Sequence, residues 1–294
     1  MVSVTHSIAQ AGADEAPLDL LAEGLPPEAR EALARAADYA RELYGESLLG
    51  SGEPAWPHAL GTALVAASLR LDLDTRLAAL LFAVSDYLED ATEKLAARFG
   101  APVAELVAGL ARLKGLQLVT RKGEGAQSVK AQAEVLRKML LAMSADIRVV
   151  LLRLASRTQS LRHLADRPGP ERAEVARESL DIYAPLANRI GVWHLKWELE
   201  DLAFRYLEPE TYKRIAKMLD ERRVEREGFI EEAIARLRGE LAAAGVKAEV
   251  FGRPKHIYSI YSKMKSKRID FAEVYDVRAL RVLVDEVRDC YTVL

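Results

Sequence analysis

The spacing of apolar residues follows a helical period along most of the chain, and this feature constrains the fold most. The last long helical pattern ends at Ala244. Only after it do apolar and polar residues alternate as in a strand, over 247–251, and a longer β-branched strand pattern follows over 274–284. The sequence therefore predicts a mainly α protein in which a helical bundle precedes the start of an α+β domain.

The expected helices are separated by short breaks, which indicates an orthogonal bundle. The residues 145–155 are apolar enough for a strand, but their length and their setting among helices favour a buried helix. Two segments with glycine, 48–57 and 115–128, are expected to be loops, the second of them mobile. The expected helices are 28–44, 58–69, 74–88, 91–99, 102–113, 129–143, 171–186, 192–207, 209–219 and 221–244.

Composition places the chain among globular proteins and limits its partners. With 294 residues, 50% of them hydrophobic, it can bury a sizeable core and form two domains. A net charge of -2 gives no global reason to expect nucleic acid, so any anion site must be local. The single cysteine, Cys290, fits a reducing compartment, and the first residues resemble neither a signal peptide nor a membrane span. We therefore expect a cytoplasmic protein without a membrane partner.

A strand, a turn and a helix meet in the stretch Gly252–Met264, GRPKHIYSIYSKM. Gly252 is expected to let the backbone turn tightly, with Arg253 and Lys255 on the turn. A helix that begins near His256 would then offer its first N–H groups to an anion. The pattern predicts a site for phosphate.

The residues that follow extend this predicted site. Ser259 and Lys263 lie four residues apart and share one face of the expected helix. Asp276 falls inside an apolar strand, where a bare carboxylate is costly unless a metal or a cation compensates its charge. Together these residues predict a nucleoside triphosphate site with Mg²⁺. The residues alone leave open that the charges are simply solvated on a helix and at a sheet edge.

Long strings of the sequence resemble one protein family. The string GRPKHIYSIYSKM, followed by YDVRALRVLVDEVRDCY, resembles the opening of the synthetase domain of the long RelA/SpoT family. The strings at 132–155 and 182–216 are similar to the same family, so the resemblance covers roughly 28–294. It implies a stringent-response enzyme that makes (p)ppGpp by transferring the β,γ-diphosphate of ATP to the 3′-hydroxyl of GDP or GTP.

The resemblance assigns roles residue by residue. It implies that Arg253 and Lys255 contact the phosphates or base of ATP, and that Ser259 and Lys263 support the phosphate contacts. It makes Asp276 a ligand of the catalytic Mg²⁺, so that Asp276, Arg253 and Lys255 are the implied catalytic residues.

Neighbouring residues receive weaker assignments. Arg281 is more plausibly a surface residue than a ligand, and Tyr258 and Tyr261 are expected to pack in the core. For His256 we expect an orienting or capping role. The family's guanine-stacking tyrosine, second metal carboxylate and most of its sheet would follow Leu294, so the implied Mg²⁺ site is incomplete and this fragment is expected to be inactive alone. Ribosome and tRNA would contact the absent C-terminal region.

The N-terminal domain of the family is an HD-type hydrolase that removes the 3′-diphosphate with Mn²⁺. It uses an early histidine, a His-Asp pair, a Glu-Asp pair, and a distant Asp and Asn. Imidazoles and carboxylates of this kind hold the metal and activate its water. The corresponding positions here are His58, then Phe82 and Ala83, then Asp86 and Tyr87, and finally Ser156 and Ser160.

Only His58 survives as an imidazole at these positions. Glu89 and Asp90 look like the acidic pair by eye, but they are out of register and are expected to be a solvated helix end. His163 and His194 are expected to pack or to lie at the surface. We therefore expect no bound Mn²⁺ and a pseudo-hydrolase domain.

Three regions follow from this comparison. The residues 1–27 would be a loose arm, 28–195 an HD-type pseudo-hydrolase domain with connecting helices, and 196–294 the truncated beginning of a nucleotidyltransferase-like synthetase domain. Loss of the HD set is typical of RelA-type enzymes, which only synthesise. A bifunctional enzyme, a Mn²⁺-dependent (p)ppGpp 3′-pyrophosphohydrolase and a non-catalytic regulatory module remain alternatives.

Overall fold

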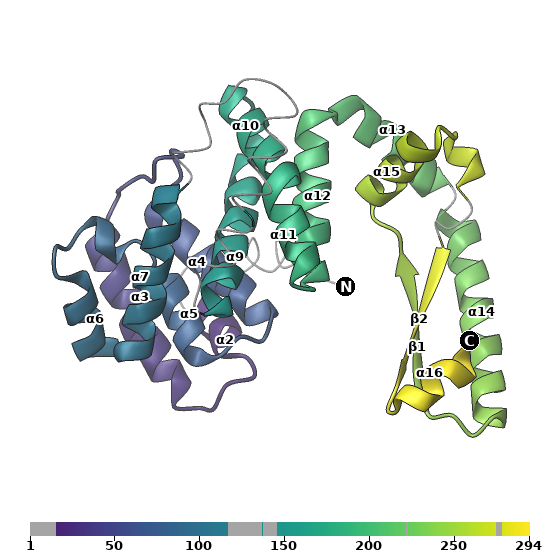
Figure 1. Ribbon diagram of the computed structural model, residues 1–294, viewed down its shortest axis with the longest axis horizontal. Coiled ribbons are helices and arrows are strands. Elements are labelled where there is room, and N and C mark those ends of the chain that lie inside the picture. Colours follow the sequence, from purple (N-terminus) through teal and green to yellow (C-terminus); the bar gives the residue numbers. More distant parts are fainter. Residues whose placement is uncertain (1–15, 117–136, 138–145, 222, 275–277) are drawn as a thin grey trace. The chain divides into compact units, whose positions relative to one another are not determined.

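A computed structural model describes residues 16–116, 137, 146–221, 223–274 and 278–294 (Figure 1). The chain forms two compact units, 1–203 and 204–294, which are described separately. The expected helix at 129–143 lies outside the described residues except for residue 137, and most of the loop at 115–128 lies outside them as well. The domain boundary expected after residue 195 stays a prediction.

The first unit is a helical bundle around one almost fully buried helix, α4. Three alanines of α4, Ala59, Ala63 and Ala66, are fully buried, and their small side chains let neighbouring helices approach closely. Helix α9 packs against α4, which confirms for the residues 147–155 the expected buried helix rather than a strand. The α-helices of the described part of the unit are α2 (Ala16–Ala22), α3 (Ala29–Tyr44), α4 (Ala55–Ser68), α5 (Leu73–Leu80), α6 (Ala91–Phe99), α7 (Ala101–Leu116), α9 (Ile147–His163), α10 (Pro170–Glu178), α11 (Ala184–Arg189) and α12 (Trp193–Leu207), whose last residues from Phe204 onward belong to the second unit.

Helix α5 ends at Leu80, so the expected helix over 74–88 is wrong in its second half. The hydroxyl of the buried Tyr44 donates to the Leu80 carbonyl at 2.9 Å and accepts from the Ala83 N–H at 3.2 Å. These two bonds satisfy the Leu80 carbonyl and the Ala83 N–H in the turn that leads into the short 3₁₀ helix η1 (Val84–Asp86). Burial raises the pKa of the Tyr44 phenol, which keeps it a hydrogen-bond donor.

The expected helix at 171–186 is divided by a wider turn. Between α10 and α11 the backbone follows a π-helical turn, η4 (Ser179–Tyr183), just before Pro185. Proline has no N–H and its ring clashes with the carbonyl four residues earlier, and a π-helical turn accommodates both effects. A second 3₁₀ turn, η3 (Leu164–Asp166), follows α9.

Part of the arm that was expected to be loose is a docked helix. Leu21 on α2 is fully buried, and the buried Arg76 on α5 donates to the carbonyls of Leu21 and Glu23 at 2.7 and 2.8 Å. These bonds satisfy carbonyls at the C-terminal end of α2. The expected loose arm over 1–27, of which 18–21 was the segment expected to dock, therefore contains a docked helix over 16–22.

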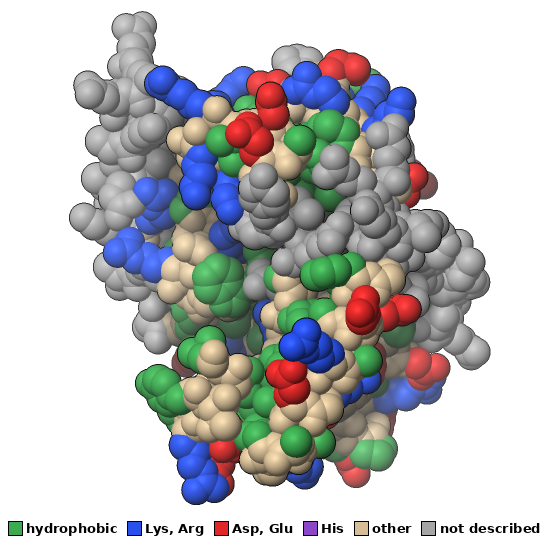
Figure 2. Space-filling view, turned by 90° about the vertical axis from the view of Figure 1, so that its right-hand side faces the viewer, with side chains coloured by type: hydrophobic (Ala, Val, Ile, Leu, Met, Phe, Trp, Pro, Cys, Tyr) green, Lys and Arg blue, Asp and Glu red, His purple; other side chains and the backbone are tan. Residues whose placement is uncertain are grey.

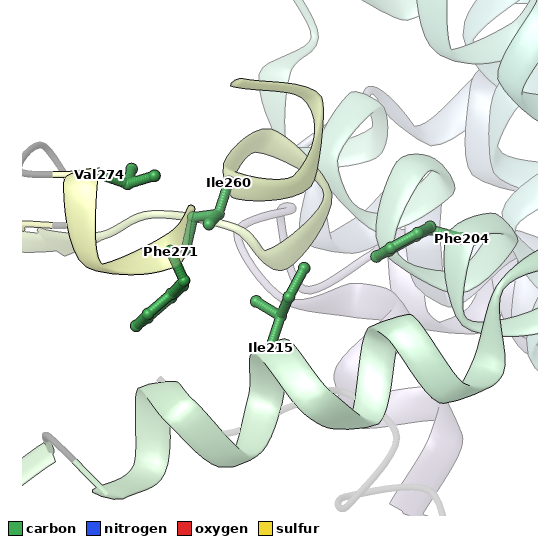
Figure 3. Close-up of a cluster of buried hydrophobic side chains, with 5 residues drawn as sticks. All are labelled: Phe204, Ile215, Ile260, Phe271 and Val274. Carbon is green, nitrogen blue, oxygen red and sulfur yellow. The ribbon is translucent and has the colours of Figure 1, made fainter. Parts of the chain in front are cut away.

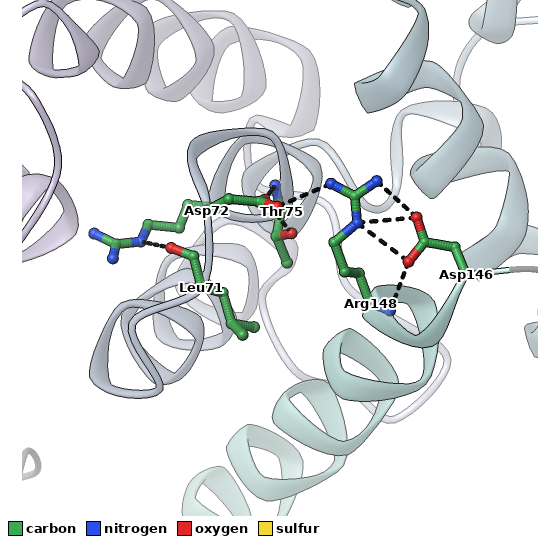
Figure 4. A network of polar contacts seen from close by, with 6 residues as sticks. Leu71, Asp72, Thr75, Asp146 and Arg148 are labelled. Atoms are coloured by element: carbon green, nitrogen blue, oxygen red, sulfur yellow. Dashed lines mark hydrogen bonds and ion pairs between the residues drawn. The ribbon is translucent and has the colours of Figure 1, made fainter.

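A polar network joins the first turns of α5 and α9 (Figure 4). Asp72 caps α5 by accepting the Thr75 N–H at 2.8 Å, and Asp146 caps α9 by accepting the Arg148 N–H at 2.9 Å. The Arg148 guanidinium donates to Asp72 at 2.9 Å and to Asp146 at 2.6 Å. The bond from Arg148 lowers the pKa of Asp146. Burial alone would raise the pKa of Asp72, but bonds from Thr75 and Arg148 lower it.

The second unit combines α-helices with a two-stranded antiparallel sheet. Val250 lies opposite Val282 in the sheet, and α14 packs against β1. The core contains five buried side chains, Phe204, Ile215, Ile260, Phe271 and Val274 (Figure 3). The elements after α12 are α13 (Pro209–Glu221), α14 (Arg223–Ala243), β1 (Ala248–Pro254), α15 (Ile257–Lys267), η5 (Phe271–Glu273), β2 (Arg278–Val284) and α16 (Val287–Val293).

The expected core aromatics pack as predicted. The rings of Tyr261 and Phe204 are stacked with their centroids 4.3 Å apart, and the Tyr258 ring meets Phe204 edge-on at 5.6 Å. Both tyrosines therefore hold α15 against the core.

Gly252 lies within β1 and not on a turn, so the expected tight turn at this residue is wrong. A Cβ atom on Gly252 would lie 2.6 Å from Cγ2 of Ile230 on α14. Glycine is needed here because the strand and the helix approach each other closely. The turn before α15 begins only after Pro254, and His256 takes the N-cap position without a side-chain cap hydrogen bond.

The described surface mixes charges and apolar side chains. On the face shown in Figure 2, Lys and Arg side chains are interspersed with Asp, Glu and hydrophobic side chains. Among the helices of the described residues, none has the length and apolar character that a membrane crossing requires.

Candidate functional site

A pocket of about 350 Å³ in the first unit collects most of the hydrolase-like positions. It lies among the loop before α4, α4 itself, the turn after α5, and helices α7, α9 and α10. Five of the seven positions line it, namely His58, Phe82, Asp86, Ser156 and Ser160.

The other two hydrolase-like positions pack beside Tyr44 and do not line this pocket. Ala83 is buried with its N–H on the Tyr44 hydroxyl, and the Tyr87 ring lies 5.4 Å from the Tyr44 ring. The bend held by Tyr44 thus turns Phe82 and Asp86 toward the pocket and directs Ala83 and Tyr87 elsewhere.

Protein groups engage both ring nitrogens of His58. Nε2 lies 2.8 Å from the Ser156 hydroxyl, and Nδ1 lies 2.8 Å from Oε2 of Glu53. The Phe82 ring packs 5.0 Å from the imidazole. All three polar side chains are buried: Glu53 is 1%, His58 2% and Ser156 8% exposed. Ser156 thus occupies one ring nitrogen of His58, and Glu53 lies against the other.

The buried Glu53 carboxylate assigns the tautomer of His58. Neither the Glu53 oxygens nor Nδ1 of His58 makes a hydrogen bond of good geometry within the described part of the chain, and the 2.8 Å approach of Oε2 to Nδ1 is the close polar contact found for this carboxylate. A buried carboxylate without a proton facing it is costly, so we place the imidazole proton on Nδ1. Nε2 then accepts the Ser156 O–H.

An ion-pair cluster forms the wall of the pocket on the side of α10. The buried Arg157 donates to Glu178 at 2.7 Å and to the Tyr183 hydroxyl at 3.2 Å, and its guanidinium lies 4.3 Å from the centre of the Tyr183 ring. Burial would raise the pKa of Tyr183, but Arg153 and Arg157 lower it. This cluster fixes α9 to α10 and to the π-helical turn.

Four polar groups around the pocket were missed by the sequence reasoning: Glu53, Thr62, Arg157 and Glu178. The Thr62 hydroxyl is buried, and the described residues provide it with no hydrogen-bond partner. The available signals were weak, namely an acidic residue five positions before His58 and arginines that alternate with serines along α9.

The donor set around His58 does not suit Mn²⁺. The hydrolase-like positions in the pocket combine one imidazole, contacted at both nitrogens, with the single carboxylate of Asp86, two serine hydroxyls and a phenylalanine, and Glu53 lies against the imidazole itself; Mn²⁺ prefers carboxylate-rich oxygen sites. In the described ranges, no group of three or more His, Cys, Asp or Glu side chains is placed to hold a metal ion.

The second candidate site lies along β1 and α15. Lys255 precedes α15, and Ser259 and Lys263 share one face of this helix, all three partly exposed. The Arg253 backbone belongs to β1, which corrects its expected place on the turn; its side chain lies outside the description, as does the whole of Asp276. Arg281 is exposed on β2. The structure therefore brings together Ser259 and Lys263, near Lys255.

Comparison with known families places both halves of the chain. The profile of the HD domain matches residues 36–193, and that of a region found in RelA/SpoT proteins matches residues 252–294. The chain belongs to the RelA/SpoT family. Its helical first unit thus contains the HD domain, and the RelA/SpoT region begins within β1 and includes α15, β2 and α16.

Curated relatives of this RelA/SpoT chain carry two kinds of name. A GTP pyrophosphokinase from Escherichia coli K12 is 47% identical over 78% of this chain and 31% of the relative. A guanosine-3′,5′-bis(diphosphate) 3′-pyrophosphohydrolase from Haemophilus influenzae is 41% identical over 87% of this chain and 37% of the relative. The chain spans about a third of the length of such relatives.

Proposed function

We propose that this chain belongs to a RelA-type alarmone synthetase whose HD domain is an inactive hydrolase. The synthetase would transfer the diphosphate of ATP to the 3′-hydroxyl of GDP or GTP in the cytoplasm. The GTP pyrophosphokinase names of several relatives support the reaction. The observation that carries the inactive hydrolase is His58, whose Nε2 is engaged by Ser156 beside Phe82.

The proposed ATP side consists of Arg253, Lys255, Ser259 and Lys263, with Asp276 as a ligand of Mg²⁺. Cations at the start of α15 would offset the charge of the phosphates, and the first N–H groups of this helix would also favour an anion bound there. A bound Mg²⁺ would neutralise developing charge on the transferred diphosphate. Because the chain spans about a third of its relatives, the complete transfer, and any ribosome or tRNA contact, is proposed for the longer protein.

Titration of the chain with ATP and Mg²⁺ tests this site. We expect Arg253→Ala and Asp276→Ala to weaken binding, and Lys247→Ala to leave it unchanged. Lys247 is the matched control because it is an exposed cation just before β1. Equal affinity for all four proteins would refute the proposed ATP site and favour a non-catalytic regulatory module.

A second candidate is a bifunctional enzyme or a Mn²⁺-dependent (p)ppGpp hydrolase. The hydrolase names of relatives that are 40% and 41% identical to this chain favour it. It requires a metal-activated water in the pocket around His58, and release of pyrophosphate from ppGpp with Mn²⁺ distinguishes it from the RelA-type proposal.

A further inference from the structure

We propose that Ser156 is an activated nucleophile, paired with His58 and Glu53, that accepts the acyl group of small carboxylic esters. The Ser156 oxygen lies 2.8 Å from Nε2 of His58, and Nδ1 of the same ring lies 2.8 Å from the Glu53 carboxylate. A nucleophile within reach of a base that a third group orients is the arrangement that activates serine in unrelated folds. This inference does not depend on the proposed synthetase.

The proton placed on Nδ1 of His58 leaves Nε2 in the state that general-base catalysis requires. With its proton on Nδ1, facing Glu53, the imidazole presents a lone pair on Nε2 to the Ser156 hydroxyl. The Glu53 carboxylate is 1% exposed and lies against Nδ1. It would stabilise the positive charge that His58 gains when it takes the serine proton.

The pocket supplies space and charge next to Ser156. The pocket has a volume of about 350 Å³, and part of its lining is apolar, formed by Phe82, Leu110, Leu152 and Val175. Such a pocket suits a small apolar acyl group. The Ser156 N–H lies in the middle of α9 and bonds within the helix, so it cannot stabilise an oxyanion. Arg153, one turn earlier on α9 and also in the lining, supplies the positive charge for that purpose.

The proposed reaction has two balanced steps. The Ser156 oxygen forms a bond with the ester carbonyl carbon as its proton passes to Nε2, and the C–O bond to the alcohol breaks as the same proton moves to the leaving oxygen. Water then attacks the acyl-serine with His58 as the base, which releases the carboxylic acid and restores the hydroxyl.

Ser160 provides a matched control on the same helix. It lies one turn after Ser156 and lines the same pocket, but His58 hydrogen-bonds to Ser156. Ser160 is the more exposed of the two serines, so accessibility alone would favour its labelling, whereas the imidazole favours labelling of Ser156.

The experiment treats the 294-residue chain with 4-nitrophenyl acetate and, separately, with a fluorophosphonate, and maps the labelled residue by peptide mass spectrometry. We expect the label on Ser156 in the wild type and in Ser160→Ala. In Glu53→Gln the rate should fall by about tenfold or more, and in His58→Gln the label should be lost. Circular dichroism checks the fold of each variant.

Two results would overturn the proposal. One is a folded wild type without label on Ser156, which decides the question even if a variant fails to fold. The other is labelling of Ser156 at an unchanged rate in folded Glu53→Gln and His58→Gln, which would show that the contacts among Glu53, His58 and Ser156 are only structural.

Discussion

Replacement of Tyr44 by phenylalanine isolates the bend that shapes the hydrolase-like pocket. The ring would keep its place beside Phe82 and Tyr87, at centroid distances of 6.2 and 5.4 Å, so the change removes only the hydroxyl. It leaves the Leu80 carbonyl and the Ala83 N–H without this partner, and both residues are buried. A buried group left unsatisfied costs roughly 1–3 kcal/mol, so we expect a loss of about 2 kcal/mol in the local stability of the bend.

Amide hydrogen exchange at Ala83 measures this loss directly. A loss of about 2 kcal/mol corresponds to roughly 30-fold faster exchange. The first unit should also unfold at a lower midpoint concentration of urea. Tyr39→Phe is the control because Tyr39 is only half-buried and packs against Phe99 at 5.7 Å. If Tyr44→Phe exchanged no faster at Ala83 than Tyr39→Phe does, the Tyr44 hydroxyl would not hold the bend.

Two further substitutions test contacts within each unit, one a close approach of strand and helix and the other an ion-pair network. Gly252→Ala should destabilise the second unit by roughly 1–3 kcal/mol, because the new Cβ would clash with Ile230. An added Ile230→Ala should recover part of that loss. An unchanged free energy of unfolding for Gly252→Ala in urea would contradict the close approach. Arg148→Gln should lower stability at neutral pH, because the lowered pKa values of Asp72 and Asp146 stabilise the folded state only while the carboxylates are ionised. The difference from the wild type should shrink as the pH falls below about 4, and a difference that is constant from pH 7 to 3 would refute this.

Helical segments were predictable where their own apolar spacing defines them. The expected helix over 91–99 has the bounds of α6, and the residues 147–155, which were expected to be helical, belong to α9. The errors occur where distant residues decide the structure. Tyr44 ends α5 from 36 residues away, and Ile230 requires a glycine at position 252 within a strand. No local pattern carries these contacts, so the sequence alone could not predict them.

The same limit applies to the candidate site. Alignment with the motif positions of the family identified His58 and Ser156 on two helices, but it could not show the hydrogen bond between them. Glu53 was missed because an acidic residue in a loop with glycine and proline is usually solvated, and only the fold shows that it is buried against His58. Asp276 lies outside the described residues, so its role stays a prediction.

The central claim is that the HD domain of this chain has lost the metal chemistry of a hydrolase. The most direct test incubates the chain with ppGpp and Mn²⁺ and measures the release of pyrophosphate. Because Ser156 engages the His58 nitrogen and Phe82 packs beside it, we expect no release above that of a protein-free control. Release that requires Mn²⁺ and is lost in His58→Gln would contradict the claim.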